Sequence, residues 1–141
     1  MSIFNDNNFT GPIELSNFDF ESNGMNMQKL NSSYNDKLTI VKFYSPTCVY
    51  CIESKKDYID LSYRVNDNET YVVAQFDCTK YPEAIDTLNN FLYGYKVEGY
   101  PTYIIFVNSL YYKTYSGGRD VNSMLNELYA IKTSNQNTIT N

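Results

Sequence analysis

Two cysteines, Cys48 and Cys51, are the residues whose type and spacing point most directly to chemistry. They follow an apolar run, Leu38–Tyr44, and a Ser-Pro step, and a charged segment compatible with a helix comes after them. This order predicts a strand, a turn and a helix, with Cys48 at the helix start. Unpaired N–H groups and the positive dipole end at a helix start favour a thiolate, the nucleophilic form of cysteine. Two thiols three residues apart lie on one side of a helix, so they can close a disulfide.

Composition limits the other kinds of function. The chain has 141 residues, of which 43% are hydrophobic, and this suits one domain with a sizeable core. A formal net charge of −5 argues against nucleic-acid or anionic-membrane partners. With 3 cysteines and no histidine, a four-ligand zinc site is not expected, and no other metal or cofactor is predicted.

The sequence shows no membrane or export signal. No run approaches the about 18 apolar residues of a membrane span, and the first residues lack the basic and apolar regions of a signal peptide. We therefore expect a cytoplasmic protein, in which a lone CxxC pair is more often catalytic than structural.

Hydrophobic periodicity predicts alternating strands and helices around the cysteine pair. The predicted strands are Ile13–Leu15, Leu38–Tyr44, Tyr71–Phe76, Thr102–Val107 and Leu110–Tyr115. The predicted helices are Phe18–Tyr34, Cys48 to about Val65, Pro82 to Leu92, and Asp120 to about Ile131. A strand–helix–strand core followed by a hairpin and a closing helix predicts an α/β fold, with a mixed sheet covered by helices on both faces.

Spacing also predicts which residues face the core. The helix after the cysteines would have Ile52, Ile59 and Tyr63 near one face, with its charged residues near the other. The last helix would bury Met124, Leu125 and Leu128. Residues 1–12 and 133–141 are polar and predict a flexible arm and tail around a domain at 13–132.

Four stretches resemble the thioredoxin superfamily and, within it, the catalytic domains of protein disulfide isomerases. They are Ile13–Phe18, similar to the opening strand; Val41–Cys51, similar to the active-site strand and motif; Tyr95–Thr102, similar to the cis-proline segment; and Tyr115–Arg119, similar to the segment with a mobile arginine. The resemblance implies a thioredoxin fold. The Asn- and Tyr-rich composition is also similar to thioredoxin-like proteins of giant DNA viruses, which would place the protein in a host cytoplasm or a virion.

The resemblance implies a thiol–disulfide oxidoreductase that reduces, forms or isomerises disulfides in protein substrates. Cys48 would attack the substrate disulfide, and Cys51 would resolve the mixed disulfide. Tyr100, Pro101 and Thr102 would bind substrate, because a cis bond at Pro101 exposes the preceding backbone for strand pairing. A reductase or glutathione is the implied partner that regenerates the pair.

Several positions depart from the family pattern. Lys42 replaces a buried acid, Val49-Tyr50 replaces the Gly-His of the isomerases, and Lys56 replaces a proline that kinks the helix. The Lys42 ammonium would either reach solvent or lie near Cys51, where it would stabilise a thiolate and raise the reduction potential. Arg119 is either a solvated loop charge or, as the family implies, a mobile cation that lowers the pKa of Cys51.

Two other functions remain open. The first is a glutathione-linked, glutaredoxin-like enzyme, with which Tyr50 and Gly117–Asp120 are compatible. The second is a non-catalytic binding or structural module. Cys78 is predicted to be a small buried hydrophobe rather than a regulatory thiol. The tyrosines of the hairpin are predicted to be sheet residues, including Tyr103, Tyr111, Tyr112 and Tyr115.

Overall fold

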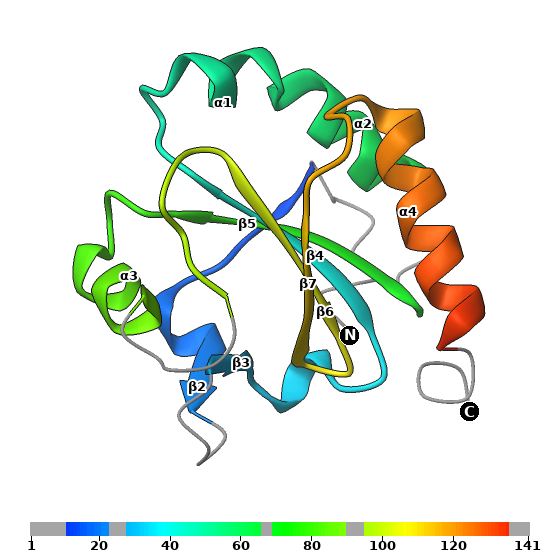
Figure 1. Cartoon of the computed structure of the whole chain (residues 1–141), viewed down its shortest axis with the longest axis horizontal. Helices are drawn as coiled ribbons and strands as arrows, with labels where there is room; N and C mark the ends of the chain where they lie inside the picture. Colours follow the sequence, from blue (N-terminus) through cyan, green and yellow to red (C-terminus); the bar gives the residue numbers. More distant parts are fainter. Residues whose placement is uncertain (1–10, 23–27, 66–68, 90–94, 136–141) are drawn as a thin grey trace.

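The computed structural model describes residues 11–22, 28–65, 69–89 and 95–135. At its centre is a five-stranded sheet in the order β1-β5-β4-β6-β7 (Figure 1). Strands β1, β5 and β4 pair in parallel, and β6 pairs antiparallel with β4 and β7. The strands span Ile13–Glu14 (β1), Leu38–Tyr44 (β4), Tyr71–Asp77 (β5), Thr102–Val107 (β6) and Leu110–Tyr115 (β7). This is the mixed sheet that the sequence predicts.

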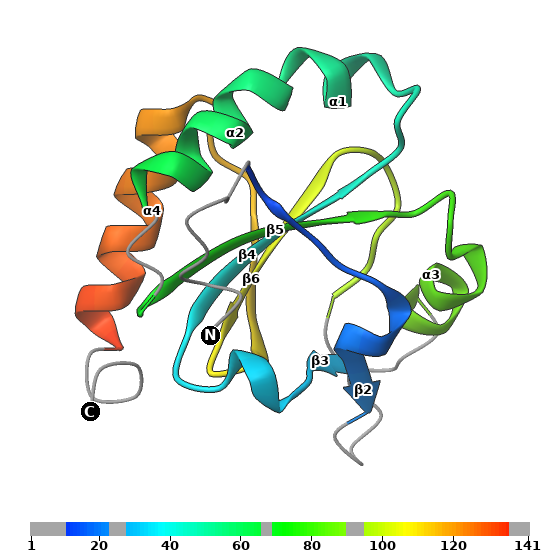
Figure 2. The ribbon, with the colours of Figure 1, turned by 180° about the vertical axis from the view of Figure 1, so that it is seen from behind.

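Helices cover both faces of the sheet (Figures 1 and 2). Helices α2 and α4 pack on one face, where their apolar residues join one core cluster, and α3 packs on the other face in a second cluster. The helices span Val49–Glu53 (α1), Lys55–Arg64 (α2), Pro82–Asn89 (α3) and Val121–Ser134 (α4). Met124, Leu125 and Leu128 are buried, as predicted for the last helix.

Strand β4 is buried on both faces. Its side chains alternate, so Leu38 and Ile40 join the cluster under α2 and α4 while Val41 and Phe43 join the cluster near α3. A near-continuous apolar run is expected of a central strand whose two faces are both covered. The strand that leads to Cys48 is therefore held in place by packing on both faces of the sheet.

The helix predicted for Phe18–Tyr34 is wrong. Its described residues form an antiparallel pair, β2 (Phe20–Ser22) with β3 (Gln28–Leu30), between 3₁₀ turns at Asn17–Asp19 and Ser32–Tyr34. Polar side chains hold backbone N–H groups in these turns: the Asn31 side chain accepts from Ser33 N at 2.9 Å, and the Asp19 carboxylate from Ser16 N at 2.8 Å. Such local bonds compete with a helix.

The helix after the cysteines is interrupted at Ser54, which has φ −90° and ψ 0°. The Ser54 hydroxyl donates to the Tyr50 carbonyl at 2.8 Å, a bond type that bends helices, so the interruption needs no proline. The predicted inner face was also wrong. Tyr58 and Leu61 are buried, whereas the side chains of Ile52 and Tyr63 are 57% and 49% exposed.

The ends of the predicted domain are described only in part. Helix α4 continues to Ser134, past the predicted boundary at 132. Residues 1–10 of the predicted arm and 136–141 of the tail lie outside the described residues, as do Phe91 and Leu92. Within the described ranges, no helix is long and apolar enough to cross a membrane.

Candidate active site

Cys48 caps the start of α1. Its backbone is extended (φ −72°, ψ 126°), and its Sγ accepts a hydrogen bond from Cys51 N at 3.3 Å. The same thiol donates to the Tyr100 carbonyl oxygen at 3.4 Å. The cap position places Cys48 among helix-start N–H groups, as the sequence predicts, and beside the segment that enters β6.

The two thiols of the pair have opposite environments. Cys48 is partly exposed, and its pKa is lowered by the hydrogen bond from the Cys51 thiol, by the backbone N–H groups of Cys51 and Tyr50, and by the Arg119 charge. Cys51 is 4% exposed. Burial, and then the hydrogen bond to Cys48, raises the pKa of Cys51 to about 11. The arrangement therefore makes Cys48 the more readily ionised thiol.

Of the three residues predicted to bind substrate, Tyr100 contacts Cys48 through its carbonyl, and Pro101 and Thr102 follow it in the chain. The peptide bond between Tyr100 and Pro101 is cis, and Pro101 is buried while Tyr100 is 38% exposed. Thr102, the first residue of β6, donates its hydroxyl to the Gly99 carbonyl at 2.6 Å. These contacts hold the Tyr100 backbone against the sulfur of Cys48.

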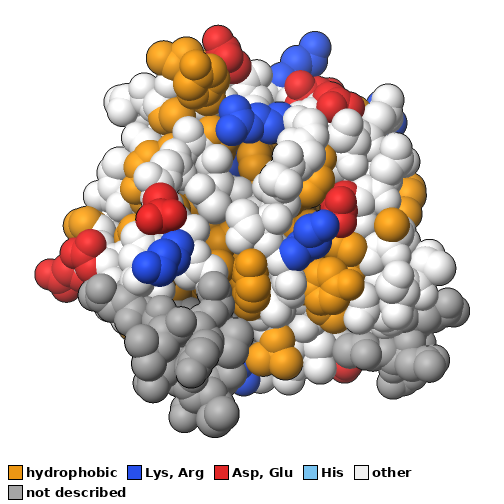
Figure 3. Space-filling model, in the orientation of Figure 1, with side chains coloured by type: hydrophobic (Ala, Val, Ile, Leu, Met, Phe, Trp, Pro, Cys, Tyr) orange, Lys and Arg blue, Asp and Glu red, His pale blue; other side chains and the backbone are white. Residues whose placement is uncertain are grey.

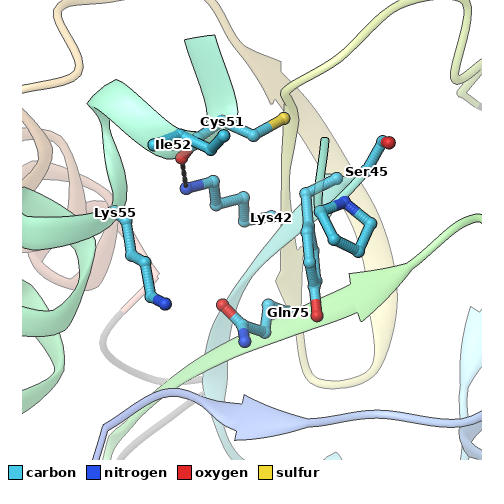
Figure 4. Close-up of a pocket in the computed structure, with 8 residues that line it drawn as sticks. Lys42, Ser45, Cys51, Ile52, Lys55 and Gln75 are labelled. Atoms are coloured by element: carbon cyan, nitrogen blue, oxygen red, sulfur yellow. Dashed lines mark hydrogen bonds between the residues drawn. The ribbon is translucent and has the colours of Figure 1, made fainter. Parts of the chain in front are cut away.

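Lys42 is a buried residue of β4, 3% exposed, so its ammonium does not reach solvent. It runs beneath α1, and its Nζ donates to the Cys51 carbonyl at 3.1 Å (Figure 4). The Nζ also lies 5.5 Å from the centroid of the Tyr58 ring. Burial lowers the pKa of Lys42, and the Cys51 and Cys48 thiols oppose this shift.

Arg119 lies in the exposed loop before α4, with its guanidinium carbon 5.9 Å from the centroid of the Tyr50 ring. Its charge helps to lower the pKa of Cys48, while the role that the family resemblance implies for it toward Cys51 stays a prediction. The structure thus places Arg119 over Tyr50, one of the two residues between the cysteines.

A pocket of about 270 Å³ lies beside Cys51, between α1 and the sheet (Figure 4). It is lined by Lys42, Tyr44, Ser45, Pro46, Cys51, Ile52, Lys55 and Gln75. In the part of the chain that the structure describes, no three His, Cys, Asp or Glu side chains are grouped so that they could hold a metal ion.

Two residues that support the site were missed by sequence reasoning. The Ser54 hydroxyl also lies 3.3 Å from the Cys51 carbonyl, and the Tyr58 hydroxyl donates to the Ile40 and Ala74 carbonyls. The available signal was the spacing of Cys51, Ser54, Tyr58 and Leu61, which marks one helix face despite the polar serine.

Cys78, directly after β5, is 3% exposed and belongs to the core cluster near α3, as predicted. Burial raises its pKa to about 12, although a hydrogen bond with the Tyr100 side chain opposes the shift. The third thiol is therefore a poor nucleophile that lies beneath the substrate-binding candidates.

Exposed apolar side chains surround the cysteine pair. Val49, Tyr50 and Ile52 on α1 are 62%, 61% and 57% exposed. Figure 3 shows hydrophobic side chains gathered at the top of the molecule, over α1. Exposed apolar patches are typical of surfaces that bind other chains.

Known proteins share this architecture. The Trx4 domain of ERdj5 superposes with a TM-score of 0.62 at 14% identity, covering 89% of this chain and 98% of that one. Human ERp44 superposes with a TM-score of 0.66 at 18% identity, covering 90% of this chain and 31% of that one. These likenesses establish the thioredoxin fold.

Sequence comparison gives relatives of the protein disulfide isomerase kind. The chain is 26% identical over 84 residues to Thioredoxin domain-containing protein 5 homolog of Drosophila melanogaster, and 29% identical over 85 residues to Protein disulfide isomerase-like 1-4 of Arabidopsis thaliana. Each match covers 60% of this chain but only 18% and 13% of the respective relatives. A family model described as Thioredoxin matches residues 20–130, which include the cysteine pair, Lys42 and the cis-proline segment, and the chain therefore belongs to the thioredoxin family.

Proposed function

We propose that the protein is a thiol–disulfide oxidoreductase that reduces, forms or isomerises disulfides in protein substrates. The observation that carries this proposal is the asymmetry of the pair: Cys48 is partly exposed with a lowered pKa, and Cys51 is buried with a raised pKa. The attacking thiol must be ionised and accessible to substrate, whereas the resolving thiol must ionise only when it attacks and needs to reach only its neighbour.

In the reducing direction, the Cys48 thiolate attacks one sulfur of a substrate disulfide. The substrate S–S bond breaks, a mixed disulfide with Cys48 forms, and one substrate thiolate leaves. Cys51, as its thiolate, then attacks the Cys48 sulfur and releases the second substrate thiolate. The substrate gains two electrons and the pair becomes a disulfide, which a reductase or glutathione must reduce again. Oxidation of a substrate dithiol is the same sequence in reverse.

Substrate binding would use the surface around Cys48. The Tyr100 backbone lies against the Cys48 sulfur, so an extended substrate segment can pair with it and bring its disulfide to the thiolate. The exposed Val49, Tyr50 and Ile52 side chains would contact apolar residues of the same substrate. The relatives are of the protein disulfide isomerase kind, which supports a protein as the substrate.

The test is insulin reduction with trapping variants. Cys48→Ser should abolish turnover, and Cys51→Ser should accumulate mixed disulfides with substrate that a reductant releases. Cys78→Ser is the matched control, because its buried thiol is outside the exchange, and it should retain turnover. If Cys48→Ser traps substrate and Cys51→Ser does not, the roles are reversed. If no variant traps and the native chain does not turn over, the protein is a non-catalytic module.

A glutathione-linked reaction is the second candidate, because the exposed Arg119 guanidinium beside Tyr50 could bind a carboxylate of a small thiol. This function would be favoured if the native chain turns over a glutathione mixed disulfide and Arg119→Gln abolishes that turnover while insulin reduction stays unchanged. The cytoplasmic location stays a prediction, which fractionation of expressing cells would check.

A further inference from the structure

Lys42 lies in a row of residues that crosses the sheet beneath α1. Strand pairing places Glu14 opposite Gln75, Gln75 opposite Lys42, and Lys42 opposite Tyr103. Directly opposed residues point to the same face, so the immediate neighbours of the ammonium in this row are neutral. Glu14 is two strands away, about 10 Å by the ordinary strand spacing.

The Glu14 carboxylate is already bound by other groups. It accepts hydrogen bonds from the Tyr44 hydroxyl at 3.0 Å and from the Gln75 side-chain amide at 2.8 Å. Lys29 pairs with Glu21 and Lys113 with Glu127, and neither of these ion pairs involves Lys42. Among the described residues, the Lys42 ammonium therefore contacts a carbonyl and an aromatic face, and it pairs with no carboxylate.

The charged and ionisable groups around Lys42 come from every element packed against it. Cys48 caps α1 and Cys51 lies within it, Lys55 begins α2, and Arg119 lies before α4. Lys55 and Arg119 are cations that repel the ammonium, and the Tyr58 and Tyr103 hydroxyls are neutral in this buried setting. A buried cation is unfavourable unless an anion compensates it. A thiolate of the cysteine pair is the anion that this arrangement supplies.

We propose that the Lys42 ammonium is the counter-cation of the cysteine pair, favouring the thiolate of Cys51 in the resolving step and stabilising the reduced over the disulfide form. This inference rests on the proposed exchange reaction. Lys42 acts here as a positioning and electrostatic residue, because its Nζ contacts the Cys51 backbone rather than the reacting sulfur.

The redox consequence follows from the balance of the reaction. A protein dithiol that reduces the Cys48–Cys51 disulfide gives up two electrons and becomes a disulfide itself. One sulfur of the pair takes one of the two protons that the substrate dithiol gives up, the second proton goes to solvent, and the other sulfur remains a thiolate near Lys42. In the disulfide form both sulfurs are neutral, so the ammonium loses its compensating anion. The cation therefore favours reduction of the pair and makes the protein a stronger oxidant.

The same charge acts on the resolving step. Cys51 must be a thiolate to attack the mixed disulfide, and burial works against that form. The Lys42 charge lowers the pKa of Cys51, so it increases the fraction of Cys51 that can react.

The first test compares three variants of the full chain in glutathione buffers. Lys42→Met removes the cation, and Gln75→Glu keeps it but places a carboxylate beside it in the row. In both variants the equilibrium between the reduced protein and its Cys48–Cys51 disulfide should shift about tenfold toward the disulfide, which corresponds to a reduction potential about 30 mV lower. Lys55→Met is the matched control, because Lys55 lines the same pocket but is exposed, and its equilibrium should change less than about twofold.

The second test measures the pH dependence of Cys51 alkylation in a Cys48→Ser background. Adding Lys42→Met should move the midpoint to higher pH, and Lys42→Arg should leave it nearer the native value. An unchanged equilibrium in both Lys42→Met and Gln75→Glu would overturn the inference, and so would a shift of equal size in Lys55→Met. The glutathione equilibrium needs no protein substrate, so failure here is distinct from failure of insulin turnover or trapping.

Discussion

At the scale of single residues, the reactivity of the three cysteines should differ with pH. Burial raises the pKa of Cys51 to about 11 and of Cys78 to about 12, whereas hydrogen bonds lower the pKa of Cys48. Thiolate is the reactive form, so brief alkylation of the reduced protein near pH 7 should label Cys48 first. Labelling of Cys51 and Cys78 should increase only as the pH rises toward those higher values.

Peptide mass spectrometry after timed exposure would measure this order, with the urea-unfolded chain as the control in which all three thiols react alike. Native labelling of Cys78 as fast as Cys48 would contradict the burial that the structure gives it.

The sequence identifies these chemical residues but not their surroundings. The spacing of Cys48 and Cys51 predicts their position at a helix start, because a strand, a turn and a helix leave few alternatives. The location of the Lys42 ammonium depends on contacts across the sheet and beneath α1. A long, flexible side chain can reach either solvent or the interior, so only the tertiary structure shows where the ammonium lies.

At the scale of elements, Tyr58 ties α2 to two central strands. Its side chain is 1% exposed, and its hydroxyl donates to the Ile40 carbonyl at 3.0 Å and to the Ala74 carbonyl at 2.6 Å. Tyr58→Phe keeps the ring and removes these bonds, so we expect it to lower the free energy of unfolding by about 1–2 kcal/mol.

Urea unfolding monitored by circular dichroism would measure this loss. The control is Tyr112→Phe on β7, where the side chain is 43% exposed and the change should stay within about 0.5 kcal/mol. Equal stabilities of the two variants would show that the buried hydroxyl contributes nothing.

Elements with strong apolar patterns were predicted closely. Strands β4, β6 and β7 have the predicted bounds, and β5 extends by a single residue to Asp77. The segment Phe18–Tyr34 was mispredicted because its asparagines and serines bind backbone groups locally, and because Phe20 packs against Phe76 with ring centroids 5.3 Å apart. That contact joins residues distant in sequence, which a local pattern does not contain.

At the scale of the whole molecule, the topology determines where the site lies. Strands β4 and β5 are parallel neighbours, and the helices that follow them, α2 and α3, pack on opposite faces of the sheet. In such sheets, reactive groups gather beyond the carboxyl ends of the strands where the connections diverge. Cys48 follows β4 and Cys78 follows β5, so both residues lie at the carboxyl ends of these parallel strands, which point to the same end of the sheet in Figure 1.

The two core clusters also predict how much of the chain can be removed. Their buried residues lie between Leu15 and Ile131. We propose that residues 11–135 form the folding unit, because the cluster residues that the structure describes all lie within this range. We expect the melting temperature and insulin reduction of the chain trimmed of 1–10 and 136–141 to stay close to those of the full chain.

A second deletion makes this expectation specific. Ending the chain after Leu128 also removes Ile131, which is 4% exposed and packs in the cluster beneath α4. Loss of one such side chain ordinarily costs about 2–5 kcal/mol, and the last turns of α4 are lost with it. The shorter chain should therefore melt well below the trimmed one in a thermal scan. A large loss of stability on removing only 1–10 and 136–141 would instead mean that these ends pack onto the domain.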